Sequence, residues 1–259
     1  MPYAESAGAK IYYESQGAGE AILFAHGAGG NAGIWFEQVA AFSDRYQCIC
    51  FDHRTFARSP ADPATITPAQ FRDDALSVLD AAGVERTHVV AQSMGGWTTL
   101  RLLLDNPDRI RSVVLSGTPG GLENRRPTES ARNLTATDDG NTGGVLATMS
   151  KATAADPVRM QLYQAINTFN TEFAMTSLKS LGAPEFIIKE DMVSQVAQPV
   201  LFIAGDEDPL FPAELLSSYV PWFPDARIEV VKDAGHSPYF EQPAVFNQLL
   251  EDFLTRGNG

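Results

Sequence analysis

The chain has 259 residues, 44% of them hydrophobic and 20% charged, a composition that suits one large globular domain with a sizeable core. Its 32 acidic and 19 basic side chains give a formal net charge of −13, whereas phosphate backbones and anionic lipids require clustered Lys and Arg. Nucleic-acid binding and membrane binding are therefore not expected, and no apolar run approaches membrane-spanning length.

Short apolar runs alternate with longer helical patterns along the chain. Apolar runs bounded by turn residues predict strands buried on both faces, and they fall at Ala21–Ala25, Tyr46–Phe51, His88–Ala91, Val113–Leu115 and Val200–Ala204. An early strand is expected at Ile11–Glu14, and a later strand with a more alternating pattern at Arg227–Val231. The helical patterns lie at Gly33–Phe42, Pro68–Ala82, Gly95–Asn106, Pro212–Tyr219 and Ala244–Thr255. This alternation is typical of an α/β fold, a mostly parallel sheet with helices on both faces.

The two cysteines lie within one predicted strand. Cys48 and Cys50 share a face of Tyr46–Phe51 but are too far apart along the strand to be bridged easily. We therefore predict reduced thiols in the core, which suit a reducing compartment. No basic segment followed by an apolar one stands near Met1, so no secretory signal is visible and we expect a cytoplasmic location.

The segment from about residue 119 to residue 185 interrupts the alternation. Loop residues at Pro119–Gly121 and Asp138–Asn141 accompany weak helical patterns at Val158–Asn167 and Glu172–Leu181. Connections in α/β folds are usually much shorter. We therefore predict a small helical cap inserted into a single domain of residues 1–259, with ordinary connecting helices as the alternative.

A serine between small residues follows the strand predicted at His88–Ala91. The sequence Ala91-Gln92-Ser93-Met94-Gly95-Gly96 places Ser93 between that strand and a helix, the layout of a nucleophile elbow. Such a turn strains the serine backbone and exposes its hydroxyl. We predict that Ser93 is a nucleophile and the chain an enzyme; an ordinary turn serine is the alternative.

Three more motifs stand directly after predicted strands. They are residues 26–30 (His-Gly-Ala-Gly-Gly), 205–209 (Gly-Asp-Glu-Asp-Pro) and 233–236 (Asp-Ala-Gly-His). Ligands bind outside the carboxyl ends of parallel strands. We therefore expect these motifs to gather around Ser93.

Together the motifs resemble the α/β-hydrolase superfamily over nearly the whole chain, with its order of serine, acid and histidine. The family's HG, G-x-x-D-x-x-x-P and G-H-x-x-x-x-E-x-P patterns match His26-Gly27, then Gly205, Asp208 and Pro212, then Gly235, His236, Glu241 and Pro243. The pattern is most similar to the small single-domain branch of serine esterases and meta-cleavage-product hydrolases. The family's D-x-R-G-x-G-x-S is altered, with Thr55 and Ala57 at both glycine positions.

The resemblance implies a catalytic triad. Ser93 is the expected nucleophile and His236 its general base, with Asp208 rather than Asp206 orienting the imidazole. The backbone amides of Ala28 and Met94 are the expected oxyanion donors. Two nearby residues are expected to be structural, His26 by shaping the oxyanion loop and Glu241 as a charge in the first turn of a helix.

The substrate pocket is expected to be apolar and small. Its candidate wall residues are Trp35, Met149, Phe169, Phe173, Leu210 and Phe211, each with ordinary core packing as the alternative. No metal-ligand cluster is seen. Gly27, Gly29 and Ala32 fit a loose dinucleotide pattern, but an oxyanion loop explains the same residues, so we expect no metal, nucleotide or other cofactor.

We therefore predict a serine hydrolase that cleaves a small carboxylic ester through an acyl-enzyme. Its partner would be a small-molecule substrate, and the protein a monomer or homodimer. One alternative is hydrolysis of a carbon–carbon bond in a dioxo acid or of an enol-lactone, which calls for an anion-binding arginine such as Arg125 or Arg126. Another is a small-molecule receptor built on the hydrolase fold.

Overall fold

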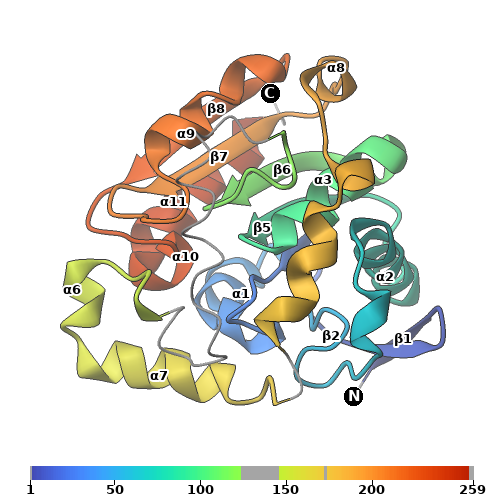
Figure 1. The fold of residues 1–259 in the computed structure, drawn as a ribbon, viewed down its shortest axis with the longest axis horizontal. Helices are drawn as coiled ribbons and strands as arrows, with labels where there is room; N and C mark the ends of the chain where they lie inside the picture. Colours follow the sequence, from blue (N-terminus) through green and yellow to red (C-terminus); the bar gives the residue numbers. More distant parts are fainter. Residues whose placement is uncertain (1, 124–145, 172–173, 257–259) are drawn as a thin grey trace.

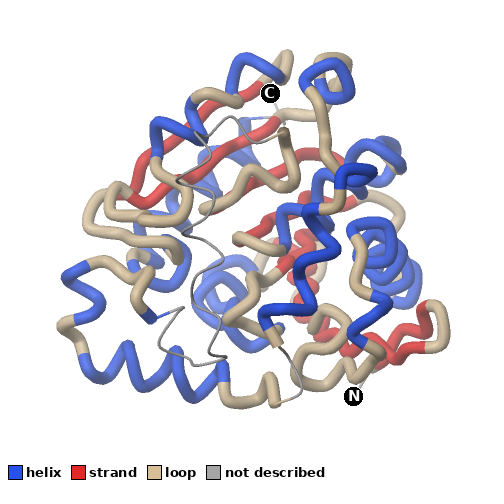
Figure 2. The backbone as a smooth tube through the Cα atoms, in the orientation of Figure 1, coloured by secondary structure: helices blue, strands red, loops and turns tan. Residues whose placement is uncertain are grey.

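The computed structural model describes residues 2–123, 146–171 and 174–256. They form a central eight-stranded sheet with helices on both of its faces (Figures 1 and 2). The strands are β1 (Tyr3–Ser6), β2 (Ala9–Gln16), β3 (Glu20–Ala25), β4 (Tyr46–Phe51), β5 (Thr87–Gln92), β6 (Ile110–Ser116), β7 (Val200–Gly205) and β8 (Ala226–Val231). Their order in space is β1-β2-β4-β3-β5-β6-β7-β8. The pairs β1–β2 and β2–β4 are antiparallel and the other pairs are parallel, so the predicted α/β architecture is confirmed.

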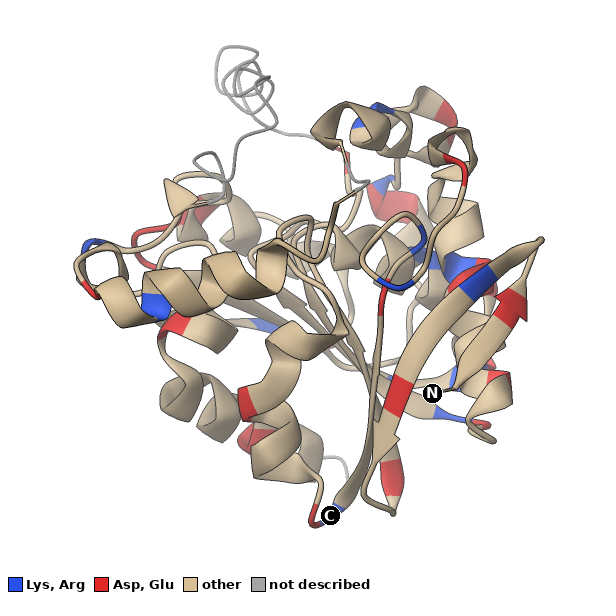
Figure 3. Ribbon diagram, turned by 90° about the horizontal axis from the view of Figure 1, so that it is seen from below, with Lys and Arg blue, Asp and Glu red and all other residues tan. Residues whose placement is uncertain are grey.

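Helices cover each face of the sheet. One face packs against α2 (Pro68–Ala81), α3 (Gly95–Asp105), α8 (Glu190–Val193) and α9 (Ala213–Ser217). The other packs against α1 (Phe36–Phe42), α10 (Pro238–Glu241) and α11 (Pro243–Thr255). Figure 3, turned by 90°, shows the twisted sheet between these layers, with charged positions of both signs interspersed over them. Among the described residues, no helix combines the length and the apolar character that crossing a membrane requires.

Residues Ala21–Ala25 of β3 form a continuous apolar run because both faces of this central strand are buried. In β3, Leu23 and Ala25 contact the layer of α2 and α3, whereas Ile22 and Phe24 face the layer of α1 and α11. Burial on both sides explains why the run has no alternating polar residues. The carboxyl ends of β3, β5, β7 and β8 therefore carry their motifs to one edge of the sheet.

Cys48 and Cys50 are free thiols buried in the core on the α11 side of β4, as predicted. Burial raises the pKa of the Cys48 thiol to about 12 and that of Cys50 well above its usual value. Neither thiol therefore ionises near neutral pH, and thiolate chemistry is not expected from them.

Two elements differ from the sequence-based expectation. Strand β1 was not predicted, because only alternate residues of this short edge strand are buried. The helix expected over residues 33–42 begins as a 3₁₀ turn, η1 (Ala32–Trp35), before α1. The side chain of Asn31 accepts the amide of Gly33 and starts this turn.

Between β6 and β7 the described residues are mainly helical. They form α6 (Lys151–Ala154), α7 (Pro157–Asn167), the 3₁₀ helices η4 (Met175–Gly182) and η5 (Pro184–Phe186), and α8. The described part of this segment contains no strand, and a single bridge pairs Leu122 with Ile188. The helix predicted over Glu172–Leu181 is a 3₁₀ helix from Met175, and the loop residues 138–141 lie outside the described residues. The boundaries of the insert stay a prediction.

Candidate active site

Ser93 occupies a strained turn between β5 and α3. Its φ of 48° lies in the left-handed region, which costs about 1–3 kcal/mol for a residue with a side chain. Its amide donates to the carbonyl of Ser116 at the end of β6, over 3.0 Å, and fastens the turn to the neighbouring strand. The strained strand-to-helix turn expected for Ser93 is thus present.

Asp208 and His236 form a buried hydrogen-bonded pair at the ends of β7 and β8. The Nδ1 atom of His236 lies 3.0 Å from Oδ2 of Asp208, while Oδ1 of Asp208 accepts the amides of Leu210 and Phe211. Burial alone would raise the pKa of Asp208, but the interaction with His236 and the two amides outweighs it and lowers that pKa. Asp206 is exposed, and it is Asp208 that contacts the imidazole.

The residues next to Ser93 and Ser116, at the ends of β5 and β6, contact His236. Gln92 donates through Nε2 to the backbone carbonyl of His236 over 3.1 Å. A Cβ atom on Gly117, which follows Ser116, would lie 3.2 Å from Nδ1 of His236. Among the residues that the structure describes, no hydrogen bond joins the Ser93 hydroxyl to the imidazole. Such pairs are often longer in unliganded sites.

The amides of Ala28 and Met94 both belong to segments beside Ser93. Within the described part of the chain, neither amide donates a hydrogen bond. A Cβ atom on Gly27 would lie 1.7 Å from Oε1 of Gln92 and 3.0 Å from Cβ of Ser93, so only glycine lets the loop pass this close to the turn. Two unpaired donors next to a serine are the arrangement that an oxyanion requires.

Two fully buried histidines support the loop that carries Ala28. The Nε2 atom of His26 accepts the amide of His53 over 3.0 Å, so its Nδ1 carries the proton and donates to the carbonyl of Gly27. Nε2 of His53 lies 2.8 Å from the hydroxyl of Thr98. Burial lowers the pKa of His26 to about 4, and burial also lowers the pKa of His53 well below its usual value.

These two histidines predict that the protein loses stability in mild acid. The unfolded chain binds a proton at each histidine near pH 6.5, whereas folded His26 does so only near pH 4. Stability is therefore complete above pH 6.5 and falls between pH 6.5 and 4, by about 3 kcal/mol for His26 alone. Urea unfolding at a series of pH values measures this slope, and His26→Gln should flatten it. An equal slope in wild type and variant would contradict the assignment.

In the altered loop of residues 52–59, the two residues that replace the family's glycines have the left-handed backbone that glycine favours. Thr55 has a φ of 71° and Ala57 a φ of 39°, both in the left-handed region. The loop is tied to the start of η1, because Oδ1 of Asp52 accepts the amide of Ala32 over 2.7 Å. The loss of two glycines thus leaves strain rather than a different path.

Replacing Thr55 or Ala57 with glycine is expected to raise the free energy of unfolding by about 1 kcal/mol. Glycine adopts the left-handed backbone without steric cost. At Thr55 it also removes a buried hydroxyl that has no hydrogen-bond partner among the described residues. Chemical denaturation checks the sign. Ala165→Gly in the exposed middle of α7 is the control and should lower stability by about 1 kcal/mol. Losses of the same size at all three positions would show that the loop is unstrained.

The expected pocket residues are not all placed at the site. Phe211 lies beside the imidazole of His236, with ring centroids 5.8 Å apart, and Leu210 precedes it. Met149 is buried in the insert segment that contacts the His236 loop. Trp35 is 0% exposed and packs in the core against Phe24 and Tyr239, which agrees with the core-packing alternative for this residue. Phe169 is 68% exposed, and Phe173 lies outside the described residues.

A separate apolar cluster adjoins the two expected oxyanion donors. Its members come from several loops and helices and pack around Met94 and Ala28: Phe56, Ile66, Phe71, Leu181, Trp97 and Leu178. Nε1 of Trp97 donates to the carbonyl of Leu181 over 2.9 Å and so fastens η4 to α3. None of these residues was predicted from the sequence. The one available signal was the pair of leucines three apart, which share a face of η4.

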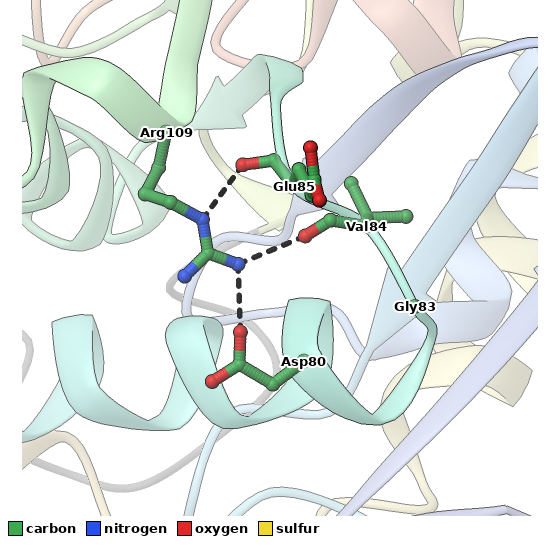
Figure 4. Close-up of a pocket in the computed structure, with 5 residues that line it drawn as sticks. All are labelled: Asp80, Gly83, Val84, Glu85 and Arg109. Atoms are coloured by element: carbon green, nitrogen blue, oxygen red, sulfur yellow. Dashed lines mark hydrogen bonds and ion pairs between the residues drawn. The ribbon is translucent and has the colours of Figure 1, made fainter.

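Two surface hollows lie at the amino ends of the strands, at the opposite sheet edge from Ser93. The larger, about 520 Å³, is lined by Asp80, Gly83, Val84, Glu85 and Arg109. Figure 4 shows the guanidinium of Arg109 pointing across it to the carboxylate of Asp80 and the carbonyls of Val84 and Glu85. These contacts hold the loop between α2 and β5 against the start of β6. The second hollow, about 410 Å³, adjoins the first through the same loop.

The described residues contain no group of three or more His, Cys, Asp or Glu side chains that could hold a metal ion. The groups that the described structure gathers here are Ser93 in its strained turn, the Asp208–His236 pair and the amides of Ala28 and Met94.

Comparisons with known proteins agree with this architecture. A family model described as the alpha/beta hydrolase fold matches residues 20–243. The putative carbamate hydrolase RutD of Azorhizobium caulinodans is 30% identical over 98% of this chain and 98% of that protein. The 2-hydroxy-6-oxo-6-phenylhexa-2,4-dienoate hydrolase of Comamonas testosteroni is 28% identical over 95% of this chain and 91% of that protein.

A solved structure is similar over its whole length. It is that of Est816, described as an N-acyl homoserine lactone degrading enzyme. Its TM-score is 0.84 at 29% identity, and the match covers 97% of this chain and 100% of that one.

Proposed function

The chain belongs to the α/β-hydrolase fold family, and on that premise we propose that it is a serine hydrolase cleaving small carboxylic esters through an acyl-enzyme. Ser93 attacks the ester carbon, His236 takes the proton of its hydroxyl, and Asp208 holds the imidazole and stabilises its charged form. The observation that carries the proposal is the 3.0 Å contact between Asp208 and His236 beside a serine in a strained turn.

The remaining steps use the same groups. As Oγ of Ser93 bonds to the carbonyl carbon, negative charge gathers on the carbonyl oxygen, where the amides of Ala28 and Met94 receive it. The start of α3 adds the positive end of its dipole at Met94. His236 returns its proton to the departing alcohol and then activates the water that releases the acid from Ser93.

The surroundings favour a neutral acyl group. The cluster next to Ala28 and Met94 is formed by aromatic and aliphatic side chains, which pack against apolar carbon. This supports esters over dioxo acids. The arginines that a dioxo acid calls for, Arg125 and Arg126, lie outside the described residues.

A second candidate substrate class is a lactone. A lactone is an internal ester, so the same attack and the same oxyanion are required. The relative that favours it is Est816, 29% identical and described as degrading N-acyl homoserine lactones. The RutD relative is named a putative carbamate hydrolase. A carbamate ester would be attacked by the same serine at its carbonyl carbon, and water would then release a carbamic acid from Ser93.

The test is a panel of p-nitrophenyl esters of rising acyl length, set beside an N-acyl homoserine lactone, an N-alkyl carbamate and a dioxo acid. We expect the fastest turnover with short neutral acyl chains and rapid labelling of Ser93 by a fluorophosphonate. Turnover of the dioxo acid alone would replace the ester proposal with carbon–carbon hydrolysis. Labelling of Ser93 with one slow turnover and a retained product would replace it with a receptor role.

A further inference from the structure

A buried carboxylate that the proposed chemistry does not use lies beneath His236. Glu241, the last residue of α10, is 4% exposed. Its Oε1 atom accepts the amides of Gly235 and Ser237, each over 3.0 Å, and its Oε2 accepts the amide of Ser150 over 2.7 Å. The sequence alone suggests a charge serving its own helix, whereas this carboxylate serves three amides outside α11.

These bonds leave the backbone around the imidazole with little freedom. The amides on either side of His236 go to Glu241, and the amide of His236 itself donates to the carbonyl of Thr148 over 2.9 Å. A Cβ atom on Gly235 would lie 2.3 Å from that same carbonyl, so the two segments touch directly. Gln92 holds the carbonyl of His236 from the side of the Ser93 turn.

The partners of this loop belong to the insert. Thr148 and Ser150 directly precede α6, and the hydroxyl of Ser150 accepts the amide of Thr153 at the start of that helix. The amide of Lys151 donates to Oε2 of Glu207 over 2.9 Å, in the loop that also carries Asp208. Residues 148–151 therefore contact both loops of the Asp208–His236 pair.

We propose that Glu241 is a positioning residue that holds the His236 loop and fastens residues 148–150 of the insert to it, so that the placement of the insert sets the position of the imidazole. The assignment rests on the proposed function, in which His236 is the base. Glu241 touches no reacting atom; it acts through the backbone from which the imidazole projects.

The chemistry of the acceptor explains why a carboxylate is needed. Both carboxylate oxygens of Glu241 accept hydrogen bonds from backbone amides. Such hydrogen bonds are stronger to an ionised carboxylate than to a neutral acceptor. A glutamine keeps one oxygen for the amides of Gly235 and Ser237 but turns its own NH₂ toward the amide of Ser150. Glu241→Gln therefore removes the bond to Ser150 of the insert and keeps the bonds to Gly235 and Ser237, whereas Glu241→Ala removes all three.

The experiment compares Glu241→Gln and Glu241→Ala with Val78→Ala, a cavity in α2 that lowers stability without touching either loop. All are assayed well below their melting temperatures. We expect kcat to fall about 10-fold in Glu241→Gln and about 100-fold in Glu241→Ala with little change in KM. The acidic limb of the kcat/KM profile should move in both, while Val78→Ala keeps wild-type kinetics. Losses no larger than those of Val78→Ala at equal melting temperature would overturn the assignment.

A second readout does not depend on turnover. The proton on Nδ1 of His236, bonded to Asp208, should give a low-field NMR resonance that shifts or broadens in Glu241→Gln and stays in place in Val78→Ala. An unchanged resonance in Glu241→Gln would overturn the positioning role. A shifted resonance in a protein without Ser93-dependent turnover would support that role while rejecting the proposed function.

Discussion

Replacing Ser93 with alanine is expected to lower kcat for ester hydrolysis by about 10⁴-fold to 10⁶-fold. In the proposed mechanism the substitution removes the oxygen that forms the acyl-enzyme, and the Asp208–His236 pair is left without a serine hydroxyl to activate. The fold should be unaffected, because alanine meets the same left-handed backbone that serine already adopts. Steady-state assays at high enzyme concentration, together with thermal unfolding, measure both effects.

Two variants sharpen this test. Ser112→Ala removes a hydroxyl that contacts His88 near the start of β6, far from the site, and should keep wild-type turnover. Ser93→Gly should be as inactive as the alanine variant yet more stable by about 1 kcal/mol, since glycine relieves the strain. Turnover by Ser93→Ala within tenfold of wild type would rule out Ser93 as the nucleophile.

The second large effect is expected from Asp208→Asn, with a fall in kcat of about 10⁴-fold. The amides of Leu210 and Phe211 both donate to Oδ1, so the carbonyl oxygen of an asparagine is held at that position. Its NH₂ group must then face Nδ1 of His236 and donate to it. The imidazole is forced to carry its proton on Nε2, the tautomer that cannot accept the proton of Ser93.

Asp206→Asn is the matched control, because Asp206 lies two residues away and its carboxylate accepts only the amide of Ala234 among the described residues. It should retain activity within about threefold, as expected for an exposed carboxylate away from reacting groups. Measurements of kcat and of the His236 ¹⁵N shifts would check the tautomer directly. Similar losses in both variants would point to a shared effect on the loop instead.

Much of the sheet could be predicted because burial on both faces leaves a signature in every central strand. Continuous apolar runs stand within these strands, at Ala21–Ala25 in β3, Val89–Ala91 in β5 and Val200–Ala204 in β7, and each is followed by a motif at the same edge. The edge strand β1 lacks that signature, since only alternate residues are buried. The pairing of His236 with Asp208 rather than Asp206 came from a family pattern, because both carboxylates follow the same strand.

The surroundings of the site were harder to predict because their positions depend on contacts between distant segments. Trp35 is an aromatic residue of the kind that lines apolar pockets, but its ring packs against those of Phe24 and Tyr239. Leu181 reaches the site through a bond from Trp97, 84 residues earlier. Glu241 meets Ser150 across 91 residues of sequence. No local pattern records such meetings.

The contact between residues 148–150 and the His236 loop also limits how this protein could be engineered. Both ends of the insert join neighbouring parallel strands, β6 and β7, so a foreign cap could be grafted there without breaking the sheet. A graft that discards Thr148 and Ser150 would remove the carbonyl that accepts the His236 amide and one of the amides that donate to Glu241. A chimera that exchanges only the residues after α6 would keep the bonds from Thr148 and Ser150 that hold the His236 loop.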